Sequence, residues 1–144
     1  MKLVLDNELI AEEFFEDTYL FGIMAPLPAH RFVWTVNRGL RFNFQLMNDL
    51  EIGINRKNRS YYYQVYEYAE PFRSLRYYLY NNLHDGEYLL PEFRHLDYLC
   101  LIKGDLPEPD AQHLLMQDLR KMEGVQMVVE LTNEKIKNKQ YLIF

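Results

Sequence analysis

The chain contains a single cysteine, Cys100, among its 144 residues, and this scarcity excludes two kinds of site. One cysteine cannot form an intramolecular disulfide, and it cannot supply the several thiolates of a structural zinc site. Cys100 stands between Leu99 and Leu101 in an apolar run. We therefore expect a buried structural thiol rather than a nucleophile, because a nucleophilic cysteine needs a polar, electropositive environment.

Recognisable catalytic and ligand-binding patterns are also missing. The chain has no P-loop, no GxGxxG and no GxSxG sequence, so the common signatures of nucleotide binding and serine hydrolysis are absent. The four histidines form no HxH, HExxH or HxxxH pair; they are His30, His84, His95 and His113. We therefore expect neither a metal nor a cofactor.

Long apolar runs are absent as well. No stretch approaches the roughly 20 residues that a membrane-spanning helix needs. The N-terminal sequence MKLVLDNELIAEEFFED becomes acidic before the apolar core of a signal peptide could form. Acidic residues outnumber basic ones by 21 to 16, and the net charge of -5 gives no bulk attraction to nucleic acid or to an anionic membrane. We expect a cytoplasmic protein without a membrane partner.

What the chain does contain is apolar and aromatic side chains. Hydrophobic residues make up 49% of the sequence and aromatic residues 15%, including 12 tyrosines and 9 phenylalanines. This composition and length predict a single folded domain, residues 1–144, with a sizeable core.

Hydrophobic periodicity predicts the secondary structure. Apolar residues recur at helical spacing in two segments, 28–40 and 111–122, so we expect amphipathic helices there. Alternating or compact apolar runs predict strands at 19–24, 40–46, 60–70, 71–82, 96–103, 125–131 and 141–144. Further expectations are a turn-rich connection at 48–60, a short edge strand at 3–5 and a helical turn at 9–15.

This order of elements indicates the fold class. Two strand–helix–strand units, at about 19–46 and 97–131, flank a tyrosine-rich hairpin. Short connections of this kind predict an α+β fold with one mostly antiparallel sheet and two helices packed on one face. A ferredoxin-like arrangement is one candidate.

One short stretch carries a family resemblance. Leu90-Pro91-Glu92 is followed, after three residues, by Leu96-Asp97-Tyr98. This spacing resembles the signature of the IPExxxVDY family of small, single-domain bacterial proteins, with leucines in place of its isoleucine and valine. The stretches HRFVWTVNRGL, LIKGDL and the closing LIF are also similar to segments of family members, so the resemblance covers most of the chain. It implies a shared fold and no particular reaction.

The motif residues Pro91, Glu92, Asp97 and Tyr98 admit three interpretations. Pro91 fixes its own φ and disfavours a helix at the preceding residue, and the carboxylates of Glu92 and Asp97 can accept hydrogen bonds from nearby backbone. We favour this structural interpretation. The alternatives are a carboxylate pair for metal or acid–base chemistry, and the recognition of a partner.

The most unusual feature is the high density of tyrosines, with interleaved arginines, between residues 56 and 80. Tyrosine favours strands and pairs well across them, so one interpretation is plain packing in a sheet whose two faces are both covered. Two helices in a chain of this size should cover only one face, however, and the other face would then expose aromatic and arginine side chains, a composition typical of protein interfaces. The candidate interaction surface, called here the tyrosine–arginine cluster, consists of Arg59, Tyr61, Tyr63, Tyr66, Arg73, Arg76 and Tyr78.

These observations predict a non-enzymatic interaction or structural protein. We expect it to form a homodimer or to bind another protein through the tyrosine–arginine cluster. Two alternatives stay open: a single-stranded nucleic-acid-binding module that uses the same surface for stacking and phosphate contacts, and a small enzyme that uses Glu92 and Asp97. The acidic total charge makes nucleic acid the less favoured partner.

Overall fold

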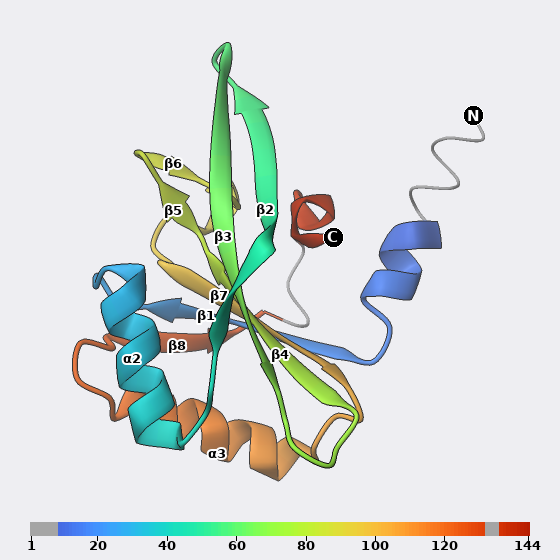
Figure 1. The fold of residues 1–144 in the computed structure, drawn as a ribbon, viewed down its shortest axis with the longest axis vertical. Coiled ribbons are helices and arrows are strands. Elements are labelled where there is room, and N and C mark those ends of the chain that lie inside the picture. Colours follow the sequence, from blue (N-terminus) through green and yellow to red (C-terminus); the bar gives the residue numbers. More distant parts are fainter. Residues whose placement is uncertain (1–8, 132–135) are drawn as a thin grey trace.

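The computed structural model describes residues 9–131 and 136–144, which form an α+β fold around one six-stranded antiparallel sheet (Figure 1). The strand order is β2-β3-β4-β7-β1-β8, and each neighbouring pair is antiparallel. These strands are β1 (Thr18–Met24), β2 (Gln45–Arg56), β3 (Arg59–Ala69), β4 (Leu75–Asn81), β7 (Tyr98–Gly104) and β8 (Met127–Glu130). A separate small hairpin pairs β5 (Leu83–His84) with β6 (Glu87–Tyr88).

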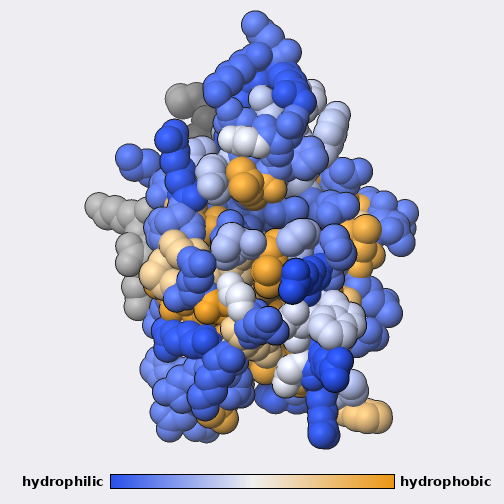
Figure 2. All heavy atoms as spheres, turned by 90° about the vertical axis from the view of Figure 1, so that its left-hand side faces the viewer, coloured by the Kyte–Doolittle hydropathy of each residue, from blue (hydrophilic) through white to orange (hydrophobic). Residues whose placement is uncertain are grey.

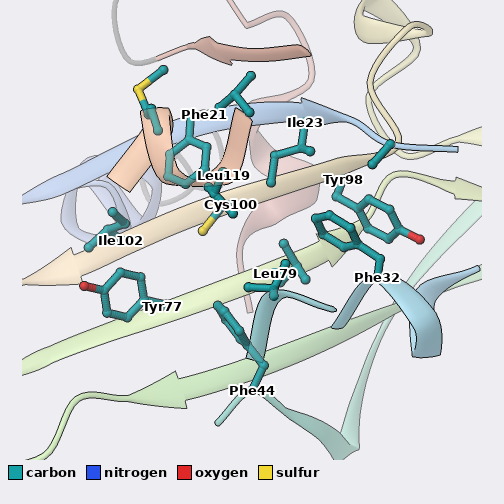
Figure 3. Close-up of a cluster of buried hydrophobic side chains, with 14 of the residues drawn as sticks. Phe21, Ile23, Phe32, Phe44, Tyr77, Leu79, Tyr98, Cys100, Ile102 and Leu119 are labelled. Carbon is teal, nitrogen blue, oxygen red and sulfur yellow. The ribbon is translucent and has the colours of Figure 1, made fainter. Parts of the chain in front are cut away.

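Two helices, α2 (Ala29–Leu40) and α3 (Pro109–Arg120), cover one face of the sheet. The buried side of α2 is made by Phe32, Val33 and Val36, which helical spacing places on one stripe. Side chains from the central strands meet the helices in a single apolar cluster, and Figure 3 shows Phe21, Leu79 and Cys100 projecting into it. The expected burial of Cys100 is confirmed, and burial raises the pKa of its thiol.

The opposite face of the sheet is also covered. A helical segment at 9–14, the β5–β6 hairpin and the two 3₁₀ helices η1 (Pro91–Phe93) and η2 (Lys139–Leu142) pack over it. This second cluster buries residues of the covering segments together with strand residues, among them Phe14, Leu89, Leu90, Leu96, Leu99, Leu101 and Leu142. The strands β1, β4 and β7 therefore form an interior layer, and most of their residues are buried whichever way they point.

The predicted class is confirmed: the fold is α+β, the sheet is antiparallel, and α2 and α3 lie on one face. The helix count was too low, because the helical turn expected at 9–15 forms a third short helix at 9–14. The strand expected at 3–5 lies outside the described residues. In the described ranges no helix combines the length and the apolar character that crossing a bilayer requires.

Two predictions between residues 40 and 60 were wrong. The strand expected at 40–46 starts only at Gln45, and the turn-rich connection expected at 48–60 is mostly strand. The chain reverses there in two residues, Lys57 and Asn58, whose φ values are 54° and 58°. Positive φ at both central positions gives a tight hairpin turn whose twist matches that of the strands, so the strands reach almost to the tip.

The prediction of a strand at 141–144 is also wrong. Residues 139–142 form η2, and the closing residues cross the second face instead of extending the sheet. The carbonyl of Leu142 accepts a hydrogen bond of 2.7 Å from the hydroxyl of Tyr80, and the Leu142 side chain is fully buried. This buried bond holds the C-terminal segment against the sheet.

We predict that Gly22 and Leu96 are energetically coupled. A Cβ built on Gly22 would lie 2.2 Å from Cδ1 of Leu96, so Gly22→Ala should destabilise the fold by about 1–3 kcal/mol through overpacking. Leu96→Ala should cost about 2–5 kcal/mol by leaving a cavity. The double variant should cost less than the sum in urea unfolding, because the added methyl occupies the vacated space. Strict additivity would contradict this packing.

Candidate functional site

The family-like motif is organised by a residue outside it, Asn82. This side chain is fully buried. Its Nδ2 donates to the carbonyls of Phe93 (3.1 Å) and Leu96 (2.8 Å), and its Oδ1 accepts from the N–H of Leu90 (2.9 Å). The backbone N–H of Asn82 donates to the carbonyl of Asp97 at 2.9 Å. Asn82 therefore fixes the loop of residues 89–97 at both ends.

Pro91 occupies the start of η1, where the missing N–H costs nothing. The preceding residue, Leu90, is extended, with φ -109° and ψ 95°, as a residue before proline should be. The turn sends the buried side chain of Leu90 into the second cluster. Pro91 thus sets the chain direction, as the structural interpretation expects.

Asp97 connects the motif to the segment that leads into α2. Its Oδ2 accepts a hydrogen bond of 2.8 Å from the N–H of Ala25, and its own N–H donates to the carbonyl of Ile23 at 2.8 Å. Burial raises the pKa of the Asp97 carboxyl, although the Ala25 N–H acts in the opposite direction. The carboxyl serves as an acceptor for backbone that has just left β1.

Tyr98 completes the same attachment. Its hydroxyl donates to the carbonyl of Leu27, and its ring stacks on Phe32 of α2 with a centroid separation of 4.2 Å and an interplanar angle of 10°. Figure 3 shows the two rings facing each other. Asp97 and Tyr98 together hold the connection between β1 and α2 in place.

Glu92 makes the corresponding link to the C-terminal segment. Its two carboxylate oxygens accept from the backbone N–H and the side-chain Nδ2 of Asn138, each at 2.9 Å. Partial burial acts to raise the pKa of Glu92, but the hydrogen bonds from Asn138 and from the backbone of Glu92 and Lys137 together outweigh it and lower the pKa below its usual value. Charge-assisted bonds of this kind favour the ionised carboxylate.

Each carboxylate of the motif is therefore engaged in an attachment of its own. Glu92 bonds to Asn138 and Asp97 bonds to Ala25, so the acceptor atoms serve different attachments. Within residues 9–131 and 136–144 there is no group of three or more His, Cys, Asp or Glu side chains placed to hold a metal ion. These contacts support the structural interpretation of Pro91, Glu92, Asp97 and Tyr98.

The tyrosines of the tyrosine–arginine cluster do not form the expected exposed face. Tyr61, Tyr63 and Tyr78 are buried in the second cluster, and Tyr66 packs partly buried on the helix side of the sheet. The expectation fails because the helix at 9–14, the β5–β6 hairpin, η1 and η2 cover the face that two helices leave open. In this stretch of β3, only Tyr62 exposes a large part of its ring, at 52%.

The arginines of the cluster are exposed but neutralised. Arg59 pairs with Asp85, Arg73 with Glu70 at 3.7 Å, and Arg76 with Glu67 at 3.1 Å. A basic side chain already paired with a carboxylate offers less attraction to a phosphate. The guanidinium of Arg59 also lies over the ring of Tyr61, 5.2 Å from its centroid. Because Tyr61, Tyr63 and Tyr78 are buried, however, their rings offer little surface on which a base could stack.

Sequence reasoning missed two features. No sequence pattern could reveal the role of Asn82, because the sequence does not distinguish a buried asparagine from an exposed one in a loop. Trp34 could have been found, because helical spacing places Phe32, Val33 and Val36 on one stripe and Trp34 outside it, on the outer side of the helix. Trp34 is 60% exposed, with the guanidinium of Arg38 5.2 Å from the ring centroid.

We predict opposite pH behaviour for the two motif carboxyls, beginning with Asp97. Its folded pKa is raised, so its contribution to stability is fully present below the unfolded pKa and is lost as pH rises through the folded pKa. Asp97→Asn keeps an acceptor for Ala25 and cannot titrate. In urea unfolding, Asp97→Asn should gain stability relative to wild type as pH rises. Asp97→Ala, which orphans the Ala25 N–H, should cost about 1–3 kcal/mol.

For Glu92 we predict the opposite dependence of folding stability on pH. Its folded pKa is lowered, so its contribution is present above the unfolded pKa and is lost as pH falls through the folded pKa. Glu92→Gln should therefore be most destabilising near neutral pH, by about 1 kcal/mol, and should converge on wild type in acid. The same pH series with Asp97→Asn serves as the control, and parallel curves for both variants would refute the assignment.

Comparison with known proteins does not assign the chain to a family. No family model matches the chain, and no curated protein matches it significantly. The resemblance to the IPExxxVDY family stays a prediction, based on Pro91, Glu92, Asp97 and Tyr98.

Proposed function

We propose that this is a non-enzymatic interaction protein that self-associates through the open edge of β2 rather than through a sheet face. The observation that carries the proposal is that the central strands β1, β4 and β7 are covered on both faces while the outer side of β2 has no strand partner in the described ranges. The backbone at Gly53, near the middle of this edge, is exposed. An unpaired edge is a template for a strand of another chain.

The order of the strands supports treating the β2–β3 hairpin as an insertion into a smaller core fold. We propose a ferredoxin-like core made of β1, α2, β4, β7, α3 and β8, into which the hairpin is inserted after α2. The four core strands lie in the order β4-β7-β1-β8, all antiparallel, with both helices on one face. The inserted hairpin extends the sheet beyond β4 and projects from the body of the molecule (Figure 1).

The geometry of the turn decides which backbone groups face outward. Arg56 and Arg59 flank the two-residue turn and pair with each other, and Ile54 pairs with Tyr61. In an antiparallel ladder the residues that bond inward alternate with residues that bond outward. The N–H and C=O groups of Glu51, Gly53 and Asn55 therefore point to the open edge, and all three residues are exposed.

The projecting hairpin is held in one position. Arg56 donates to the carbonyl of Tyr88 and, at 3.2 Å, to that of Leu89, while Lys57 pairs with Glu87 at 2.5 Å. The hydroxyl of Tyr63 donates to the Glu87 carbonyl at 3.0 Å. These contacts attach the hairpin to β5–β6, so an incoming strand meets an ordered edge and less entropy is lost on binding.

A second copy fits this edge in a specific register. Antiparallel pairing centred on Gly53 places Glu51 opposite Asn55 and Ile52 opposite Ile54, so no like charges face each other. The inner half of β2 is protected, because its pairing with β3 shifts register between Leu46 and Glu51. The contact is confined to the outer half of β2, and such a short edge predicts weak, concentration-dependent association.

The other functions considered have less support. The ion pairs of Arg59, Arg73 and Arg76 weaken the case for nucleic acid on the tyrosine–arginine cluster, and the hydrogen bonds of Glu92 and Asp97 weaken the case for an enzyme. The cytoplasmic location stays a prediction.

The test is sedimentation equilibrium over a wide concentration range with wild type, Gly53→Lys and Gln64→Lys. Wild type should gain mass with concentration. Gly53→Lys should stay monomeric, because paired copies would place two lysines opposite each other. Gln64→Lys adds the same charge to the exposed outer face of the hairpin, away from the edge of β2, and should behave as wild type. Monomeric wild type throughout, or equal association of both variants, would overturn the proposal.

A further inference from the structure

The outer face of α2 carries exposed basic side chains around one large aromatic ring. Arg31, Trp34 and Arg38 are all exposed and follow at spacings of three and four residues, which place them on one stripe about 10 Å long. Arg41, which ends the helix, is also exposed. The buried stripe of α2 lies on the opposite side of the helix, so this face is free of any role in the core.

These arginines differ from those of the tyrosine–arginine cluster in their partners. In the described part of the chain Arg31, Arg38 and Arg41 take part in no ion pair, whereas Arg59, Arg73 and Arg76 each do. The guanidinium of Arg38 lies 5.2 Å from the centroid of the Trp34 ring. Glu123 lies beside Trp34 and Arg38 on the same shallow surface and pairs with neither. The face is thus locally positive on a chain with a net charge of -5.

Exposed tryptophan with arginine is the composition that dominates binding energy in protein interfaces. Figure 2 views the side of the molecule on which α2 lies in Figure 1, and it shows mostly hydrophilic residues with small, separate hydrophobic patches. A partner on this side therefore finds little continuous apolar area and must be recognised through charge and the single large ring.

We propose that the outer face of α2 binds a carboxylate-rich segment of a partner protein. The guanidinium groups of Arg31 and Arg38 supply paired donors that match carboxylate geometry, and Trp34 between them supplies the apolar contact. A protein segment fits better than a nucleic acid, because single-stranded nucleic-acid binders use grooves with several stacking rings. The face is a convex helix with one ring, and Arg38 already lies over that ring.

Trp34 is the only tryptophan in the chain, so its fluorescence reports this face alone. The experiment titrates the full protein with poly-L-glutamate and, at matched charge, with oligodeoxythymidylate, at low and at moderate salt. Poly-L-glutamate should change the emission of Trp34 in a saturable manner, and salt should weaken the response.

The variant Arg31→Gln with Arg38→Gln should weaken binding by about 2- to 5-fold for each arginine removed, as expected for exposed charge pairs. Arg73→Gln, which removes an arginine that is paired with Glu70, is the matched control and should bind as wild type. Circular dichroism checks that all variants fold.

Three outcomes would overturn the proposal. One is no saturable change with poly-L-glutamate, and another is an equal loss of affinity in Arg73→Gln. The third is a tighter, arginine-dependent response to oligodeoxythymidylate, which would assign the face to nucleic acid instead. The proposal does not depend on the edge of β2, and each can fail alone.

Discussion

The buried carboxamide of Asn82 is the interaction on which the second layer of this fold depends. Its three side-chain hydrogen bonds close the loop of residues 89–97 and satisfy backbone groups that are shielded from water. With that loop fixed, Leu90 and Leu96 pack fully buried against the sheet. The same closure presents Glu92 to the C-terminal segment and Asp97 to the start of the connection to α2. The family-like motif is thus the outer part of an attachment whose centre is Asn82, which precedes Leu90 by eight residues in the sequence.

The burial of the central strands on both faces explains why this chain uses many tyrosines as well as phenylalanines. A tyrosine ring fills an apolar layer while its hydroxyl reaches a polar group at the rim. Tyr80 reaches the carbonyl of Leu142, Tyr63 that of Glu87 and Tyr98 that of Leu27. On the helix side, Tyr19 contacts the sulfur of Met116, and its pKa is raised to about 12, chiefly by burial. The tyrosines are therefore structural anchors between segments that are distant in sequence.

The sequence was sufficient where one local pattern decides the outcome. Phe32, Val33 and Val36 repeat at helical spacing, and the helix forms there. It was insufficient where distant residues decide. The segment INRKNRS has the composition of a loop, yet Lys57 and Asn58 alone make the turn, and Arg56 and Arg59 pair as strand residues because β5–β6 offers carbonyls and carboxylates to hold them. The closing YLIF is apolar enough for a strand, but the site that receives Leu142 lies on a sheet face, which no local pattern encodes.

Contacts between distant residues also decide which arginines are structural and which are candidates for binding. In the sequence, arginines among tyrosines suggested a binding surface, whereas no pattern drew attention to the arginines of the helix. The partners reverse this judgement: Arg59, Arg73 and Arg76 meet carboxylates of their own chain, while Arg31 and Arg38 meet none in the described residues. An arginine paired within the chain has part of its charge compensated before a ligand arrives, whereas an unpaired one next to an exposed ring retains its full attraction for a carboxylate. Composition locates charge, but only the pairing of that charge within the fold indicates where a partner can use it.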